Sequence, residues 1–402
     1  MMVGGFLSLH HLSHGALHGI DRLLCGLLRC AVLRQHQNCC TACRHAQTER
    51  EQKCLSLHFK IPPFDISLPK KSRKLSFQFA QNMVYSMYHF LEAIIMAIDV
   101  LQEKIRKCKN PVMVGLDPYL PILPQHIVND AFAANGQTIE GATAAYERFC
   151  TELIDALKNV VPAVKLQSAC FEALGAQGIA LMQKLSKYAT ELGYYVLIDS
   201  MRSDIGPVAE IHAQAMFDSV PIGQERYPLY QCDALTVNGY LGTDGIQPFL
   251  PYCKNAGKNI FVVLKTSNKS SREVQDLLSG DRVVYTAMAD LLMRWSNGLY
   301  GKNGYSEIGA VVGATYPQTL KMLREKYDRM FFLVPGYGTQ GGTAKKVQFA
   351  FDRFGHGAII AASRSIICAW QKAGSDGTDY LTHAVAAAEQ MKKDISKYVV
   401  IL

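Results

Sequence analysis

The stretch FFLVPGYGTQGG, residues 331–342, says most about the fold of this chain. Its first four residues form an apolar run without polar alternation, which is typical of a parallel strand covered on both faces. A glycine-rich loop follows at once. Seven other short apolar runs resemble it, and they cover residues 112–116, 163–166, 194–198, 234–237, 260–264, 310–312 and 358–361.

Amphipathic segments separate these runs, and their apolar spacing is typical of helices that cover a sheet. They include residues 144–159, 179–192, 207–217, 282–299, 316–327 and 344–354. Eight strand–helix units predict an α/β fold of the (β/α)8 TIM-barrel type over residues 96–402. A doubly wound open sheet is the alternative.

The composition is that of a large globular protein, with 402 residues, 49% of them hydrophobic and 19% charged. Collagen-like and wholly disordered classes are excluded, and no apolar run reaches the ~18–20 residues of a membrane helix. Residues 1–95 hold 11 basic and 5 acidic side chains, whereas residues 96–402 hold 31 and 29. The basic excess therefore gives no reason to expect a nucleic-acid partner for the main body.

Residues 1–95 are predicted to be a basic extension with little structure, because they show no sustained helical or strand period. Cys40 and Cys43 with His45 nearby resemble half of a metal site, but no second pair follows at zinc-finger spacing, so we predict no metal. A targeting segment is the alternative. A helix is predicted directly after Met96, with Asp99 as its N-cap.

Single scattered cysteines in the main body indicate a reducing compartment such as the cytoplasm. Six of the twelve cysteines lie between residues 25 and 54, and the other six occur one at a time. No disulfide framework is expected.

The active site of such a barrel lies at the C-terminal ends of the strands. The polar residues that follow or end the apolar runs are therefore the candidates for function. In chain order they are Asp117, Lys165, Asp199, Asp204, Asn238, Thr266, Ser267, Gln340 and Arg364.

The loops after the seventh and eighth strands predict a phosphate site. Gly338 and Gly341 let backbone N–H groups approach an anion, and Arg364 can bind it through two hydrogen bonds. A flexible turn with a surface arginine is the alternative.

Charged residues at the mouth of the barrel are the second signal. Isolated charges are costly there, so Lys165, Asp199 and Asp204 are expected to pair. A structural ion pair that closes the barrel is the alternative. Asp117 is either an acceptor for a ribose hydroxyl or a turn residue before Pro118.

Seven motifs in this order resemble orotidine 5'-monophosphate decarboxylase in its longer bacterial subfamily. They are VGLDP (114–118), VKLQ (164–167), FEALG (171–175), DSMRSDIG (199–206), LTVN (235–238), KTSN (265–268) and VPGYGTQGG (334–342). The D-x-K-x-x-D element is shared with sugar-phosphate decarboxylases of the same superfamily, and the other motifs make the narrower assignment.

The resemblance implies a decarboxylation without cofactor that forms UMP and carbon dioxide in pyrimidine biosynthesis. It also implies a homodimer in which Asp204 reaches into the partner's site. Lys165 and Asp199 would form the charged network at the reacting carboxylate. The substrate-binding residues would be Asp117 at the ribose, Gln340 and Arg364 at the phosphate, and Asn238, Thr266, Ser267, Gly338 and Gly341.

The chain departs from the family pattern at Met201, which occupies the position of the proton-donating lysine. Methionine carries neither a charge nor a transferable proton. Ser203 also stands where glycine is usual, and Leu166 where proline is usual. We therefore predict an impaired decarboxylase, with a non-catalytic barrel that binds a nucleotide phosphate as the alternative. No residue favours a different sugar-phosphate lyase.

Overall fold

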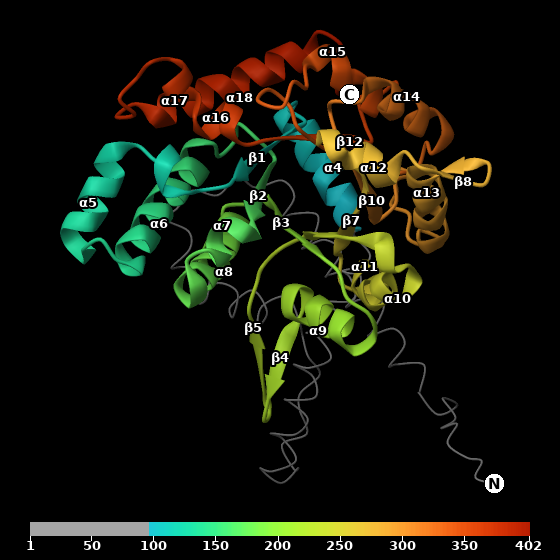
Figure 1. Cartoon of the computed structure of the whole chain (residues 1–402), viewed down its shortest axis with the longest axis horizontal. Coiled ribbons are helices and arrows are strands. Elements are labelled where there is room, and N and C mark those ends of the chain that lie inside the picture. Colours follow the sequence, from blue (N-terminus) through green and yellow to red (C-terminus); the bar gives the residue numbers. More distant parts are fainter. Residues whose placement is uncertain (1–95) are drawn as a thin grey trace, which may run out of the picture. The chain divides into compact units, whose positions relative to one another are not determined.

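The computed structural model describes residues 96–402, and eight parallel strands form a closed barrel within them (Figure 1). The strands of the barrel are β1 (Val112–Leu116), β2 (Ala163–Gln167), β3 (Tyr195–Arg202), β6 (Ala234–Val237), β7 (Asn259–Lys265), β10 (Ile308–Val312), β11 (Phe332–Pro335) and β12 (Ala358–Ala362). Their order is β1-β12-β11-β10-β7-β6-β3-β2, and β1 pairs with both β2 and β12. The predicted TIM barrel is confirmed, and the alternative of an open sheet is wrong.

Helices surround the strands and cover their outer faces (Figure 1). The longer helices are α4 (Ala97–Cys108), α5 (Gln125–Asn135), α6 (Ile139–Ala156), α8 (Gly175–Glu191), α9 (Gly206–Phe217), α13 (Val284–Trp295), α14 (Pro317–Lys326) and α18 (Tyr380–Ser396). The shorter ones are α7 (Ser168–Glu172), α10 (Thr243–Ile246), α11 (Leu250–Asn255), α12 (Arg272–Gln275), α15 (Ala344–Val347), α16 (Arg364–Ile367) and α17 (Ala369–Lys372).

The strands are buried because each lies between the barrel interior and this layer of helices. Every residue of β1, β10 and β12 is buried, which explains why these segments are apolar without alternation. The predictions for residues 1–95, including the extension, Cys40, Cys43 and the targeting segment, lie outside the described residues.

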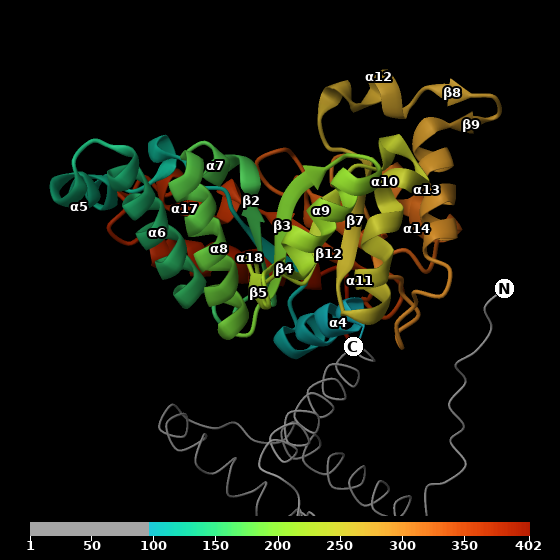
Figure 2. The same cartoon turned by 90° about the horizontal axis from the view of Figure 1, so that it is seen from below.

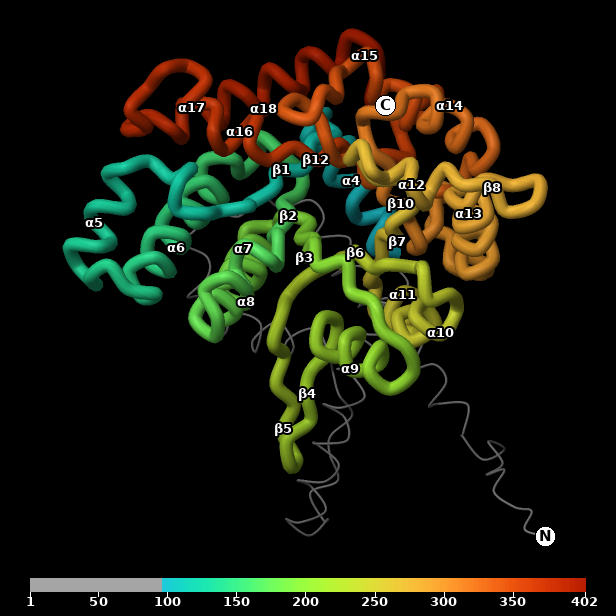
Figure 3. Tube along the Cα trace, in the orientation of Figure 1, coloured from blue at the N-terminus to red at the C-terminus, as the bar shows by residue number. Residues whose placement is uncertain are grey.

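Two short hairpins leave the barrel, and the sequence analysis predicted neither of them. β4 (Ser219–Ile222) pairs antiparallel with β5 (Glu225–Pro228), and this hairpin stands away from the ring of strands (Figure 3). β8 (Leu278–Ser279) pairs with β9 (Arg282–Val283). Figure 2 shows α12, β8 and β9 at one end of the barrel and α4 at the other.

The first helix follows Met96 as predicted, but Asp99 does not cap it. The N-cap residue is Met96, and Asp99 lies inside the first turn of α4. Its carboxylate instead accepts hydrogen bonds from the backbone N–H groups of Lys302 at 2.7 Å and Asn303 at 3.1 Å. The prediction was wrong because these partners, some 200 residues away in sequence, cannot be read locally.

We expect the chain beginning at Met96 to fold and to have the same thermal midpoint as the full chain. The barrel closes between β1 and β12 within residues 96–402, and the N–H group of Ile98 in α4 is bound by the buried carboxylate of Glu307. Circular dichroism on both chains checks this. Aggregation of the shorter chain, with the full chain in solution, would contradict it.

Candidate active site

Lys165 lies at the centre of a charged cluster at the C-terminal ends of the strands. Its ammonium donates hydrogen bonds to Asp117 Oδ1 at 3.0 Å and to Gln167 Oε1 at 2.8 Å. The Oδ2 atom of Asp199, on β3, lies 3.1 Å from the same nitrogen. The three donors of the ammonium thus have three oxygen partners. The structure brings Lys165 and Asp199 together, as the cost of isolated buried charges predicts, and it adds Asp117, which the sequence did not assign to this pairing.

The neighbouring carboxylates stabilise the protonated, positively charged form of Lys165. Burial alone would lower the pKa of this lysine, but the carboxylates of Asp117 and Asp199 outweigh burial and raise the pKa above the ordinary lysine value. Lys165 therefore remains a cation at neutral pH. The site has a fixed positive charge here rather than a group that titrates in the physiological range.

Thr236 fixes the other side of Asp199, and sequence analysis gave it no role. Its hydroxyl donates to Asp199 Oδ1 at 2.8 Å and accepts from the backbone N–H groups of Ser200 at 3.0 Å and Met201 at 2.9 Å. Thr236 is buried on β6, in the run Ala-Leu-Thr-Val. The signals in the sequence were a single hydroxyl within an otherwise apolar strand and the place of Thr236 in the motif LTVN (235–238).

Met201 has an unusual backbone conformation beside this cluster. Its φ is 46°, a left-handed value that costs a non-glycine residue about 1–3 kcal/mol. The pairing of β3 with β6 shifts register between Ile198 and Arg202, and Met201 lies within this irregularity. Met201 as a whole is 45% exposed, so it is not packed into the core. The Thr236 hydroxyl accepts a hydrogen bond from the Met201 N–H group, and this bond stabilises the strained backbone conformation.

Asp204 lies apart from the Lys165 cluster within one chain. Its Oδ1 atom accepts a hydrogen bond from the N–H group of Ile205 at 2.8 Å, and no ion pair to Lys165 is found among residues 96–402. The expected pairing of Asp204 with Lys165 was therefore wrong within one chain, because the ammonium of Lys165 is bound by Asp117, Asp199 and Gln167 instead.

A second group of site residues joins the loops after β7 and β11. The Ser267 hydroxyl donates to Gln340 Oε1 at 2.5 Å. Gly336 allows this approach: its φ is 98°, and a Cβ there would lie 3.2 Å from the Ser267 Cβ and 3.0 Å from Gln340 Oε1. Thr266 precedes this pair, and its N–H group donates to Gln275 Oε1 at 2.9 Å. These two loops therefore meet directly.

The glycine-rich loop after β11 packs against the loop after β12. Gly338 has a φ of 74°, and a Cβ at this position would lie 2.8 Å from the Cβ of Ser365. Gly341 also has a positive φ, of 90°. Arg364 is the first residue of α16, its side chain is exposed, and it makes no ion pair with another residue of the described part of the chain. The two loops predicted to bind phosphate are thus adjacent in the fold.

The side chain of Asn238 already makes one hydrogen bond within the turn that follows it. Its side-chain oxygen accepts from the N–H group of Tyr240 at 3.0 Å, which caps the short 3-10 helix Gly239–Leu241. Its amide nitrogen is therefore the part of Asn238 that remains for a ligand.

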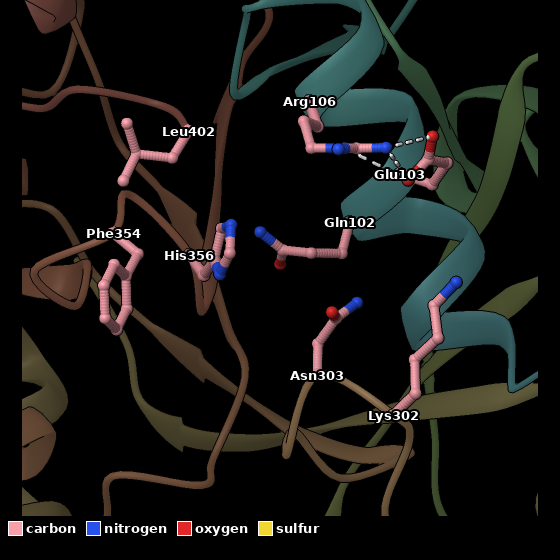
Figure 4. A pocket seen from close by; sticks show the side chains of 8 residues that line it. All are labelled: Gln102, Glu103, Arg106, Lys302, Asn303, Phe354, His356 and Leu402. Atoms are coloured by element: carbon pink, nitrogen blue, oxygen red, sulfur yellow. Dashed lines mark hydrogen bonds and ion pairs between the residues drawn. The ribbon is translucent and has the colours of Figure 1, made fainter.

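A pocket of about 370 Å³ lies elsewhere on the barrel, and Figure 4 shows its lining. Its walls come from α4, residues 302–303 and residues 354–356, which precede β1, β10 and β12, so it lies at the N-terminal end of the strands. Its Arg106 is paired with Glu103 at 2.8 Å within α4. In TIM barrels this end serves stability rather than catalysis, so the pocket is not the active-site candidate.

Neither a metal centre nor a membrane helix is found in the described residues. Residues 96–402 contain no group of three or more His, Cys, Asp or Glu side chains that could hold a metal ion. Within the same residues, no helix is long and apolar enough to cross a bilayer.

Comparison with known proteins identifies the family. Residues 93–374 match the family model described as "Orotidine 5'-phosphate decarboxylase / HUMPS family". The chain is similar to orotidine 5'-phosphate decarboxylase of Rhodopirellula baltica, with 36% identity over 299 residues, 73% of this chain and 97% of that protein. It is similar to the enzyme of the same name from Caldicellulosiruptor bescii, with 33% identity over 298 residues, 74% of this chain and 97% of that protein.

A solved structure agrees with this assignment. The OMP decarboxylase of Leishmania donovani is 29% identical to the chain and has a TM-score of 0.57, with 76% of this chain and 99% of that chain covered. The barrel, the charged cluster at its C-terminal end and the family match over residues 93–374 lead to one conclusion: the chain belongs to the orotidine 5'-phosphate decarboxylase family, a family of carboxy-lyases.

Proposed function

We propose that this chain binds orotidine 5'-monophosphate in the cytoplasm, converts it to UMP and carbon dioxide for pyrimidine biosynthesis, and does so slowly because of Met201. The observation that carries the proposal is the buried Lys165 ammonium between the carboxylates of Asp117 and Asp199, 3.0 and 3.1 Å away, at the C-terminal end of the barrel. A fixed charge cluster of this kind suits a reaction in which negative charge moves from a carboxylate to a ring carbon.

The proposed chemistry needs electrostatic stabilisation and one proton. In orotidine 5'-monophosphate the carboxylate is attached to C6 of the pyrimidine ring. The bond between C6 and the carboxylate carbon breaks, carbon dioxide leaves, and the electron pair stays on C6 until a proton reaches it. Preorganised charges aimed at such a centre are usually the largest catalytic contribution. We assign Lys165 and Asp199 to the charged network at the reacting carboxylate, and Asp117 to the ribose.

The remaining substrate contacts are assigned to the joined loops. Gln340 and Arg364 suit a phosphate, because arginine binds phosphate through two hydrogen bonds. The N–H groups of Gly338 and Gly341 already donate to the carbonyl oxygens of Gly342 at 2.9 Å and of Gly338 at 2.8 Å, so we assign these glycines to shaping the loop around the phosphate through their positive φ. We assign Thr266, Ser267 and Asn238 to the nucleoside part of the substrate. The phosphate is remote from C6, so its binding energy can be used to order the site.

Met201 limits this proposal, and it favours one alternative. Its thioether can neither donate a proton to C6 nor stabilise negative charge there. A non-catalytic barrel that binds UMP through Asp117, Gln340 and Arg364 is therefore the second candidate function.

A homodimer completes the proposed site. Asp204 does not form an ion pair with Lys165 within residues 96–402, and exposed apolar residues follow it in the sequence. Ile205, Val208 and Ile211, at the start of α9, are 54%, 44% and 62% exposed. Exposed apolar side chains gathered on one face are typical of an interface. We propose that a second copy covers this face and receives Asp204 at its own site.

The two candidate functions are separated by two measurements on the full chain. We expect UMP to bind in a calorimetric titration and orotidine 5'-monophosphate to be decarboxylated at a low but measurable rate. Binding without any decarboxylation would favour the non-catalytic barrel. No binding of UMP would overturn both candidates.

A further inference from the structure

We infer that Lys265 is a positioning residue, which holds the segment carrying Thr266 and Ser267 in place by a buried ion pair with Asp276. This inference rests on the proposed function, because it assigns a role to a residue outside the proposed substrate contacts. The evidence is the surroundings of the Lys265 ammonium.

The Lys265 side chain is buried although it carries a charge. It closes β7, its side chain is 1% exposed, and its ammonium donates to Asp276 Oδ1 at 2.6 Å and to Ser271 Oγ at 3.2 Å. The ring of Tyr316 lies 4.6 Å from the same nitrogen, a distance at which an aromatic face attracts a cation. A buried charge is retained only where partners compensate it, and here both hydrogen-bond partners, Ser271 and Asp276, come from one loop.

That loop, residues 266–283, folds back on the strand that precedes it. Ser271 and Asp276 lie on either side of α12, so one ammonium binds the loop at two points. Between them, Gln275 accepts from the Thr266 N–H group at 2.9 Å and donates to the Thr266 hydroxyl at 2.9 Å. The loop is therefore tied to the residue next to Ser267.

Ser267 has little freedom of its own. Gly313 and Gly336 pack against it, since a Cβ at Gly313 would lie 2.7 Å from the Ser267 Cα and one at Gly336 would lie 3.2 Å from its Cβ. Its hydroxyl reaches Gln340 on the loop after β11. A small shift of residues 266–276 would therefore break the junction of the two loops that the proposed substrate contacts require.

The decisive variant is Lys265→Met, which keeps the length of the side chain and removes its charge. At a temperature well below the unfolding transition, we expect the Kd for UMP to rise about tenfold, the scale of ordering one or two loose side chains on binding. We also expect faster amide hydrogen exchange in residues 266–279. Lys269→Met is the matched control, because Lys269 is an exposed lysine on the same loop, and it should change neither quantity.

The Asp276→Asn variant removes the other partner of the same ion pair, whose side chain is partly exposed and therefore easier to replace than the buried lysine. If the pair acts as a unit, Asp276→Asn weakens UMP binding by a similar factor, and the double variant is no worse than either single one. Should Lys265→Met fail to fold, Asp276→Asn alone decides. A folded variant with unchanged exchange and unchanged UMP affinity overturns the inference. If the unmodified chain does not bind UMP, the proposed function fails, and hydrogen exchange alone then decides whether Lys265 holds the loop.

Discussion

The Met201→Lys variant is expected to decarboxylate orotidine 5'-monophosphate at least ~10²-fold faster than the unmodified chain, the low end of what a positioned general acid supplies. Position 201 follows Asp199 by two residues, and its N–H group is held by Thr236 at 2.9 Å. Met201 is 45% exposed, so a lysine of similar length can take its place without repacking the core. Initial rates under saturating substrate measure the effect.

The Met201→Gln variant is the matched control, because glutamine is polar and of similar length but carries no positive charge. It should show no gain, and UMP affinity should change little in either variant. High activity in the unmodified chain would contradict this account and would mean that another group, with Lys165 as the first suspect, supplies the proton. No gain in a folded Met201→Lys variant would mean that Ser203 and Leu166 have already displaced the site.

The Arg364→Ala variant is expected to weaken UMP binding by ~2–4 kcal/mol, about 30- to 900-fold in Kd, which is the scale of truncating one partner of a desolvated charge pair. Arg364 begins α16 directly after β12, and its exposed guanidinium has no ion-pair partner among residues 96–402. Calorimetric titration with UMP and with uridine measures the effect, and uridine affinity should hardly change.

The Arg106→Ala variant is the control for Arg364, because Arg106 lies at the opposite end of the barrel and pairs with Glu103. It should bind UMP like the unmodified chain. Equal losses for UMP and uridine in Arg364→Ala would show that the arginine supports the fold instead of binding phosphate.

The sequence predicts the barrel from its eight apolar runs, and it predicts much of the charged cluster from the polar residues at the ends of these runs. Once eight apolar runs are parallel strands, their C-terminal residues must share one end of the barrel, and burial forces Lys165 to pair with carboxylates. This reasoning places Asp117, Lys165 and Asp199 in one region. It requires no knowledge of side-chain geometry.

The remainder depends on contacts between distant segments and on local backbone geometry. Thr236 binds Asp199 only because β3 and β6 are neighbours, and the left-handed conformation of Met201 depends on a register shift between these strands. The pair Lys265–Asp276 depends on a loop that folds back on its own strand. None of these produces a periodic pattern that a single sequence can show.

The most direct test of the central claim is the release of labelled carbon dioxide from carboxyl-labelled orotidine 5'-monophosphate by Met201→Lys, with and without a second substitution, Asp199→Asn. The claim is that decarboxylation takes place at the cluster of Lys165, Asp117 and Asp199. We predict release by Met201→Lys and a fall of ~10²-fold or more when Asp199→Asn is added, because a preorganised charge beside the reacting carboxylate is lost. Undiminished release from the double variant would contradict the claim, since the activity would then arise away from this cluster.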